Sequence, residues 1–175
     1  MKPTVTENSA GAGTIDFDLD HFLPYRLSVL TNTISEGLAR RYRDLQPLSV
    51  TEWRILAVLG RFPGLVASEV CDRTAMDKVA ISRGVRSLME KGMLDRQQDR
   101  SDRRRQRLFI SPGRGERVLQ RVVPVALRYE GQLVESLDAG ELEALSRIME
   151  KLLRQSESLD ADPRRTSGPL SDTQA

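Results

Sequence analysis

Residues 76–94 read MDKVAISRGVRSLMEKGML, and their polar and apolar side chains separate onto two faces of a predicted helix. Asp77 is the expected N-cap, because its carboxylate can accept hydrogen bonds from the free amides of the first turn. Gly92 stands where a helix C-cap is expected. The face predicted to pack carries Ile81, Val85, Leu88 and Met89, and the opposite face carries Val79, Ser82, Arg83, Arg86 and Glu90. This stretch therefore predicts a helix with one face turned outward.

The next residues, 95–110, read DRQQDRSDRRRQRLFI and predict a two-stranded antiparallel hairpin. Leu108 and Ile110 alternate with Arg107 and Phe109, as a half-buried strand requires. Residues 95–107 hold six arginines against three aspartates, so the hairpin tip is basic. A helix followed by a basic hairpin is the outline of a winged helix-turn-helix, whose helix and wing together straddle a DNA duplex.

Upstream of this stretch the sequence predicts further helices. The first is long, with Asp20 as its N-cap and its end near Tyr42, because apolar residues recur every three or four positions. The second begins at residues 49–52, Ser-Val-Thr-Glu, where hydroxyl and carboxylate can each satisfy a free amide, and it ends near Leu59. A third begins near Ala67. These helices are expected to support the outward-facing helix.

Downstream, apolar spacing predicts a long helix to about Leu137 and a last helix from Glu141 to about Leu153. The expected fold is mainly α with a small antiparallel β-wing, a winged helix-turn-helix flanked by long dimerisation helices. Its parts are a flexible arm (1–19), a helical dimerisation region (20–45 and 112–155), the winged helix-turn-helix (46–111) and a flexible tail (156–175). The terminal helices carry more apolar surface than a small winged domain covers, so we expect a partner subunit to cover the rest.

Length and composition limit the classes of protein to which this chain can belong. The chain has 175 residues, 39% hydrophobic and 30% charged, which suits one globular core. Its net charge is only +2, so any DNA contact must come from local patches. No apolar run reaches the roughly 18 residues of a membrane span, and residues 1–18 lack the pattern of a signal peptide. We therefore expect a cytoplasmic protein without membrane association.

The residue types present disfavour other chemistry. Cys71 is the single cysteine, which excludes an internal disulfide, and we interpret it as a small buried hydrophobe rather than a redox sensor. His21 is the single histidine, so a catalytic dyad or a multi-histidine metal site cannot be built. The hairpin aspartates lack the spacing of a calcium loop, so ion pairs with nearby arginines are expected instead. We predict no enzyme activity, no cofactor and no metal site.

Three segments of the sequence resemble the MarR family of bacterial transcription regulators. Residues 48–56 (LSVTEWRIL) are similar to the family's second helix, residues 76–83 (MDKVAISR) to its recognition helix, and residues 99–104 (DRSDRR) to its wing. The resemblance covers about residues 20–153 and implies a homodimer, held by interlocked first and last helices, that binds a pseudo-palindromic operator in double-stranded DNA. The sequence departs from the family at Val66, where a threonine often caps the third helix, so either Ser68 takes over or the helix start is looser.

The residue pattern and the resemblance together predict the DNA contacts. Ser82 and Arg86 are expected to read base edges, with Arg83 nearer to the phosphates. The resemblance implies that Arg103 reaches into the minor groove, with Asp102 helping to orient it. The predicted DNA-binding residues are Ser68, Lys78, Val79, Ser82, Arg83, Arg86, Arg103, Arg104 and Arg105.

The resemblance also implies control by a small molecule, because many family members lose DNA affinity when an aromatic ligand occupies a cleft between the dimerisation and DNA-binding parts. An aromatic side chain beside a fixed cation suits a planar anion. We expect a repressor released by a small aromatic acid or its thioester, with His21, Tyr25, Arg26 and Trp53 as candidate contacts. The alternative left open is a winged-helix module that binds protein without specific DNA binding.

Overall fold

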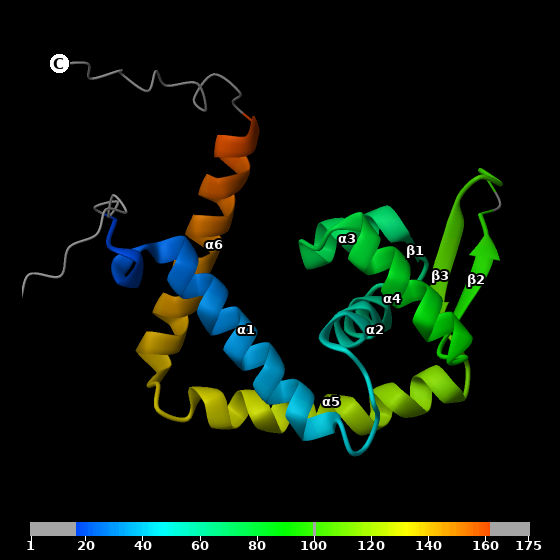
Figure 1. Ribbon diagram of the computed structural model, residues 1–175, viewed down its shortest axis with the longest axis horizontal. Helices are drawn as coiled ribbons and strands as arrows, with labels where there is room; N and C mark the ends of the chain where they lie inside the picture. The colour runs from blue at the N-terminus through cyan, green and yellow to red at the C-terminus, as the bar shows by residue number, and fades with distance from the viewer. Residues whose placement is uncertain (1–16, 100, 162–175) are drawn as a thin grey trace, which may run out of the picture. The chain divides into compact units, whose positions relative to one another are not determined.

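The computed structural model describes residues 17–99 and 101–161 (Figure 1). The chain divides into two compact units at Leu119 and Gln120, and each unit is described by itself. The predicted arm falls outside the described residues up to residue 16, and the predicted tail falls outside them from residue 162. The expected fold, mainly α with a small antiparallel wing, is confirmed.

The first unit holds the winged helix-turn-helix. Its elements are the 3-10 turn η1 (Leu19–His21), α1 (Leu23–Tyr42), α2 (Val50–Arg61), β1 (Leu65–Val66), α3 (Ala67–Thr74), α4 (Lys78–Glu90), β2 (Leu94–Gln98), β3 (Gln106–Ile110) and the start of α5 (Arg114–Val134). Helices α2, α3 and α4 contact one another, and β2 and β3 form the hairpin that follows α4 (Figure 1).

The start of the first long helix differs from the prediction. Asp18, not Asp20, is the capping residue, and its carboxylate accepts hydrogen bonds from the first amides of η1. Helix α1 begins only after Phe22, with Pro24 in its first turn, where a missing N–H costs nothing. His21 therefore lies in the 3-10 turn and not in the long helix.

The predicted capping box of α2 is confirmed. The Ser49 hydroxyl accepts a hydrogen bond from Glu52 N (3.1 Å), and the Glu52 carboxylate accepts one from Ser49 N (2.8 Å). Helix α3 shows only half of this arrangement, because its N-cap residue is Val66, which has no side-chain acceptor. The Glu69 carboxylate accepts from Val66 N at 2.9 Å. Ser68 thus does not take over the cap.

Helix α4 has the predicted cap and the predicted faces. Asp77 Oδ1 accepts hydrogen bonds from Val79 N and Ala80 N, both at 2.9 Å. The buried residues of α4 are Ile81, Gly84, Val85 and Leu88. Gly84 packs closely against α2, since a Cβ there would stand 2.6 Å from the end of the Ile55 side chain and would displace it. Gly92 follows the helix with φ 65°, the left-handed conformation that glycine adopts at little cost.

The sheet has one strand more than the predicted hairpin. Strand order is β1-β3-β2, with both pairs antiparallel. The added strand β1 pairs Leu65 with Leu108 and Val66 with Arg107. Two residues are too short for an alternating pattern, so the sequence carried no signal for β1. The added strand joins the middle of β3 to the segment just before α3.

The core of the first unit lies among these elements. Fully buried side chains come from α2, α3, α4, β3, the end of α1 and the residue before β2, and they are Tyr42, Ile55, Leu56, Leu59, Val70, Ile81, Val85, Leu88, Met93 and Leu108. Cys71 is buried and unpaired, which agrees with its interpretation as a small hydrophobe. The core packs against the buried face of α4 and leaves the other face of this helix in solvent.

The second unit comprises the rest of α5 and α6 (Ala139–Ala161). Asp138 and Glu141 cap α6 reciprocally, each carboxylate accepting from the other residue's amide at 2.8 and 3.0 Å. Helix α6 runs to Ala161, past the predicted end near Leu153, because the sequence has no helix breaker before Pro163. None of the described helices combines the length and apolar character needed to cross a bilayer.

Candidate nucleic-acid interface

The outer face of α4 is polar, basic and exposed. Lys78, Val79, Ser82, Arg83 and Arg86 all face solvent there, and Val79 is 57% exposed although it is apolar. The structure thus brings five of the predicted contacts onto one helix face. Arginine and serine are side chains that hydrogen-bond to base edges and phosphates, and an apolar side chain can contact a thymine methyl group.

A buried carboxylate holds the end of α4 against α2. Glu52 is 4% exposed, and its Oε1 accepts hydrogen bonds from Ser87 Oγ (2.7 Å) and Lys91 Nζ (2.5 Å). Burial alone would raise the pKa of Glu52, but the hydrogen bonds from Lys91, Ser49 N and Ser87 outweigh it and lower the pKa below its usual value. Glu52 is therefore ionised at neutral pH and fixes the C-terminal end of α4.

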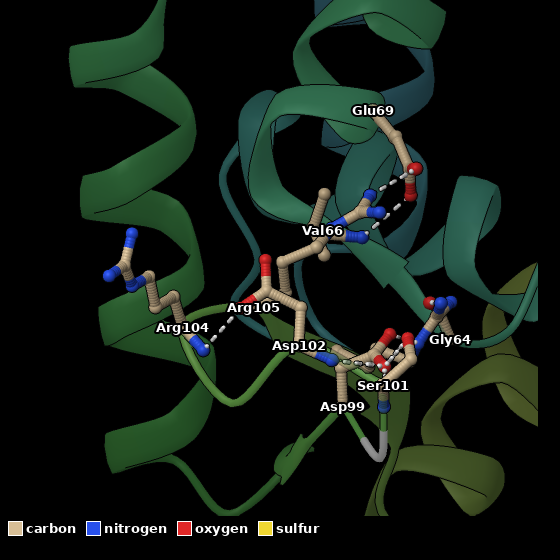
Figure 2. A network of polar contacts seen from close by, with 9 residues as sticks. Gly64, Val66, Glu69, Asp99, Ser101, Asp102, Arg104 and Arg105 are labelled. Carbon is tan, nitrogen blue, oxygen red and sulfur yellow. Dashed lines mark hydrogen bonds and ion pairs between the residues drawn. The ribbon is translucent and has the colours of Figure 1, made fainter.

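The wing turn is organised around Asp99, as Figure 2 shows. Its Oδ1 accepts hydrogen bonds from Ser101 Oγ (2.6 Å) and Ser101 N (2.7 Å), and its Oδ2 accepts one from Arg107 Nε (2.5 Å). The Ser101 hydroxyl, then its amide and Arg107, hold the pKa of Asp99 well below its usual range. The side chain is 5% exposed, so the turn folds over it.

Two arginines attach the wing to the rest of the unit. Arg107 Nη1 donates to the Gly64 carbonyl at 2.8 Å, immediately before β1. Arg105 Nη2 donates to Glu69 Oε1 at 2.9 Å, and this pair connects the wing with the first turn of α3 (Figure 2). The Val66 amide, followed by Arg105, lowers the pKa of Glu69. These contacts give the wing a defined direction before any partner binds.

The wing tip presents Arg103 and Arg104 to solvent. Asp102 Oδ1 accepts from Arg104 N at 2.9 Å, and Gln98 Nε2 donates to the Arg103 carbonyl at 2.9 Å. Asp102 therefore shapes the backbone of the turn, whereas the resemblance had implied that it orients the Arg103 side chain. Both tip guanidinium groups stay available to a negatively charged partner.

Ser68 and Arg105, the remaining predicted DNA contacts, lie outside the α4 face and the wing tip. Ser68 is exposed in the first turn of α3, near the wing attachment. Arg105 is engaged with Glu69, so its charge is partly neutralised within the chain. The expected ion pairing of the hairpin aspartates is present for Asp99 and Arg107. In the described ranges no group of three or more metal-ligating side chains gathers.

The four candidate ligand contacts do not form one site. Tyr25 and Arg26 line a depression of about 330 Å³ on α1, together with Asp20, Val29, Leu30 and Thr33. His21 Nδ1 is instead paired with Asp18 at 2.7 Å, outside this lining. Trp53 lies on α2, its ring 6.0 Å from that of Tyr42.

The sequence did not predict the residues that hold α4 and the wing in place. Glu52 was interpreted only as a cap, and Ser87, Lys91 and Glu69 received no role. Their partners lie at least 35 residues away, and one sequence does not reveal such pairs. The one signal in the sequence was Glu52 itself, a carboxylate among the apolar residues of α2.

Comparison with known proteins gives a consistent result. Residues 46–105 match the model described as MarR family. The Escherichia coli transcriptional regulator HosA is 19% identical over 124 residues, which cover 71% of this chain and 91% of HosA.

Solved structures share the fold. A MarR/EmrR family regulator from Acinetobacter sp. ADP1 has a TM-score of 0.75 at 23% identity, covering 81% of this chain and 99% of that one. The repressor CouR, bound to a 23-mer DNA duplex, has a TM-score of 0.67 at 23% identity, covering 77% and 94%. BpsR of Bordetella bronchiseptica, whose DNA binding is regulated by 6-hydroxynicotinic acid, has a TM-score of 0.69 at 18% identity, covering 78% and 96%.

Proposed function

Because this chain belongs to the MarR family of transcriptional regulators, which are not enzymes, we propose that it is a homodimeric, sequence-specific repressor of transcription. It binds a pseudo-palindromic operator through α4 and the wing, and it acts in the cytoplasm. The observation that carries the proposal is the exposed basic face of α4. The hydrogen bonds from Ser87 and Lys91 to Glu52 hold this helix against α2. CouR, a relative in fold, is a repressor bound to a DNA duplex.

The proposed roles of the two DNA-contacting parts differ. Ser82 and Arg86 read base edges, and arginine is well suited because it can hold the O6 and N7 atoms of guanine with two hydrogen bonds. Arg103 and Arg104 at the wing tip supply charge to the minor groove and the flanking phosphates. Lys78 and Arg83 lie beside the base-reading residues and contact phosphates.

Apolar side chains exposed on the described helices support the homodimer. On η1 and α1 they are Leu19, Phe22, Leu23, Tyr25, Leu27, Val29 and Leu30, and on α5 and α6 they are Val123, Leu127, Leu133, Leu145, Ile148, Met149, Leu152, Leu153 and Leu159. So many exposed apolar side chains on each set of helices are unusual for a monomeric protein and indicate an interface. A two-fold dimer covers both sets and places the two copies of α4 about one DNA turn, roughly 34 Å, apart.

A small aromatic acid or its thioester is the proposed effector. The support is the depression on α1, which Tyr25 and Arg26 both line, and the regulation of BpsR by 6-hydroxynicotinic acid. Such a ligand must bind the DNA-incompetent state more tightly, since equal affinity for both states would shift nothing. A coupling of about 1 to 3 kcal/mol would change DNA affinity roughly 5- to 150-fold.

The proposed function is tested by selecting duplexes from a random DNA pool with the full-length protein. A homodimeric repressor enriches one inverted repeat, and that repeat should occur at a promoter the protein switches off. Aromatic acids and their thioesters are then screened for release of the complex, with Arg26→Ala as the site variant. Enrichment of no sequence would contradict the DNA-binding proposal, while a ligand that acts equally on Arg26→Ala would contradict only the assigned contact.

A further inference from the structure

We propose that the DNA interface extends beyond α4 and the wing, to a basic groove at the corner between α1 and α2 that binds phosphates of the DNA backbone. This inference rests on the proposed function, because it assigns a further contact surface to the same operator complex. Its key residues are Arg40 and Arg43, at the end of α1, neither of which the sequence pattern assigned to DNA.

Two adjoining depressions form the groove. The first, of about 390 Å³, lies between the start of α2 and α4 and is lined in part by Ser49, Thr51, Arg83, Ser87 and Lys91. The second, of about 430 Å³, lies between the end of α1 and the start of α2 and is lined in part by Glu36, Arg40, Arg43 and Ser49. Ser49 belongs to both linings, so the two depressions adjoin at the start of α2.

The charge in this groove is suited to an anion. Its basic residues are Arg40, Arg43, Arg83 and Lys91, and among the residues the structure describes only Lys91 has an acidic partner, Glu52. In the described part of the chain neither Arg40 nor Arg43 has a carboxylate partner within 4.0 Å, and both are exposed. Of the two acids in the linings, Glu52 is buried and engaged, which leaves Glu36 as the one exposed negative charge.

Continuity with the recognition helix identifies the anion as DNA. Arg83 lies on the exposed face of α4 and also lines the groove, so a duplex that meets α4 passes the mouth of the groove. A duplex presents phosphates in a continuous row, whereas a small anion would occupy only one depression. Hydroxyl groups of Ser49 and Thr51 add donors of the kind that hold phosphate oxygens.

The test compares charge variants on the duplex that the wild-type protein selects, by fluorescence anisotropy across a range of salt concentrations. In the Arg40→Gln/Arg43→Gln double variant the slope of log affinity against log salt should become shallower by about one unit for each phosphate that is no longer neutralised. Affinity near 0.1 M salt should fall roughly five- to fiftyfold. The ratio of selected to random duplex should not change, because phosphate contacts carry no base information.

Two single variants serve as controls, one expected to have no effect and one expected to have the opposite effect. Arg61→Gln removes the same charge from the opposite end of α2, outside both linings, and should leave the slope unchanged. Glu36→Gln removes a negative charge from the groove and should tighten binding. If the double variant behaves like Arg61→Gln, the groove does not contact DNA. If the wild-type protein shows no preference for any duplex, the proposed function itself has failed.

A second measurement locates the contact on the DNA. Replacing single phosphates of the selected duplex by uncharged methylphosphonates weakens wild-type binding wherever a phosphate is held. At the phosphates seated in the groove, the same replacement should cost little further affinity in the double variant. Equal penalties in both proteins at every position would overturn the proposal, whatever the overall loss of affinity.

Discussion

Ser87 in the last turn of α4 donates a hydrogen bond of 2.7 Å to the Glu52 carboxylate in the first turn of α2. Lys91, just beyond α4, donates to the same oxygen. The end of α4 is thereby fixed to the start of α2, across a separation of 35 residues in the chain. This contact fixes the orientation of α4 relative to α2.

Removing the shared carboxylate should weaken the fold. Glu52→Ala deletes half of the α2 capping box and leaves Ser87 and Lys91 without their acceptor, so the free energy of unfolding should fall by about 1 to 3 kcal/mol. Denaturant unfolding measures this change. Adding Lys91→Met to Glu52→Ala should cost less than the two single changes together, because both act on one contact. Strict additivity would show that the pair is not coupled.

The wing should become less stable in acid. The Asp99 pKa is held below that of an unfolded chain, so the Asp99 contribution to stability is present above about pH 4 and is lost as the pH falls toward the lowered folded pKa. Asp99→Asn should therefore be less stable than wild type near pH 7, and the difference should shrink near pH 3. Denaturant unfolding at several pH values makes the comparison, and a pH-independent difference would contradict the ionised-carboxylate account.

Arg103 and Arg105, the first and last of three consecutive arginines in the wing, should differ in their effect on DNA binding. Arg103 is exposed at the tip, whereas Arg105 is paired with Glu69. Arg103→Ala should make the salt slope shallower by about one unit and weaken all duplexes alike. Arg105→Ala should change the slope less and should lower wing stability instead. Equal salt slopes for Arg103→Ala and wild type would remove the wing tip from the interface.

A homodimer should depend on the apolar surface of the long helices. Light scattering at micromolar concentration should give twice the mass of one chain. Leu127 and Leu153 are 61% and 62% exposed, and Leu127→Glu/Leu153→Glu should shift the protein toward monomer. Val79→Glu is the matched control, because Val79 is likewise apolar and exposed but lies on α4. A wild-type protein that stays folded and monomeric at this concentration would contradict the proposed assembly.

The sequence predicted the elements whose signals are local. Asp77 was predicted as the cap of α4 and Ser49 as that of α2, because a capping side chain and the amides that donate to it lie within three residues. The exposed and buried faces of α4 followed from helical periodicity alone. The single cysteine and its burial followed from composition and neighbours.

Features that depend on distant partners or weak local preference were missed. Strand β1 exists because β3 provides a pairing edge, and two residues carry no period of their own. Asp18 and Asp20 are both plausible caps by residue type, but Asp18 caps the turn η1, and α1 begins after Phe22 without a side-chain cap. The extension of α6 to Ala161 was missed because polar residues were interpreted as a tail, although Arg154, Gln155 and Glu157 among them are good helix formers. The Arg105 pairing with Glu69 likewise required the fold.

Replacing Arg86 tests most directly whether the exposed face of α4 reads a DNA sequence. The measurement is the affinity of wild type and Arg86→Ala for the selected duplex, for that duplex with single base pairs changed, and for a random duplex, at one salt concentration. Wild type should prefer the selected duplex, and Arg86→Ala should lose about 1 to 3 kcal/mol on it while becoming indifferent to one base pair in each half-site. An equal loss on selected and random duplexes would contradict base reading by α4.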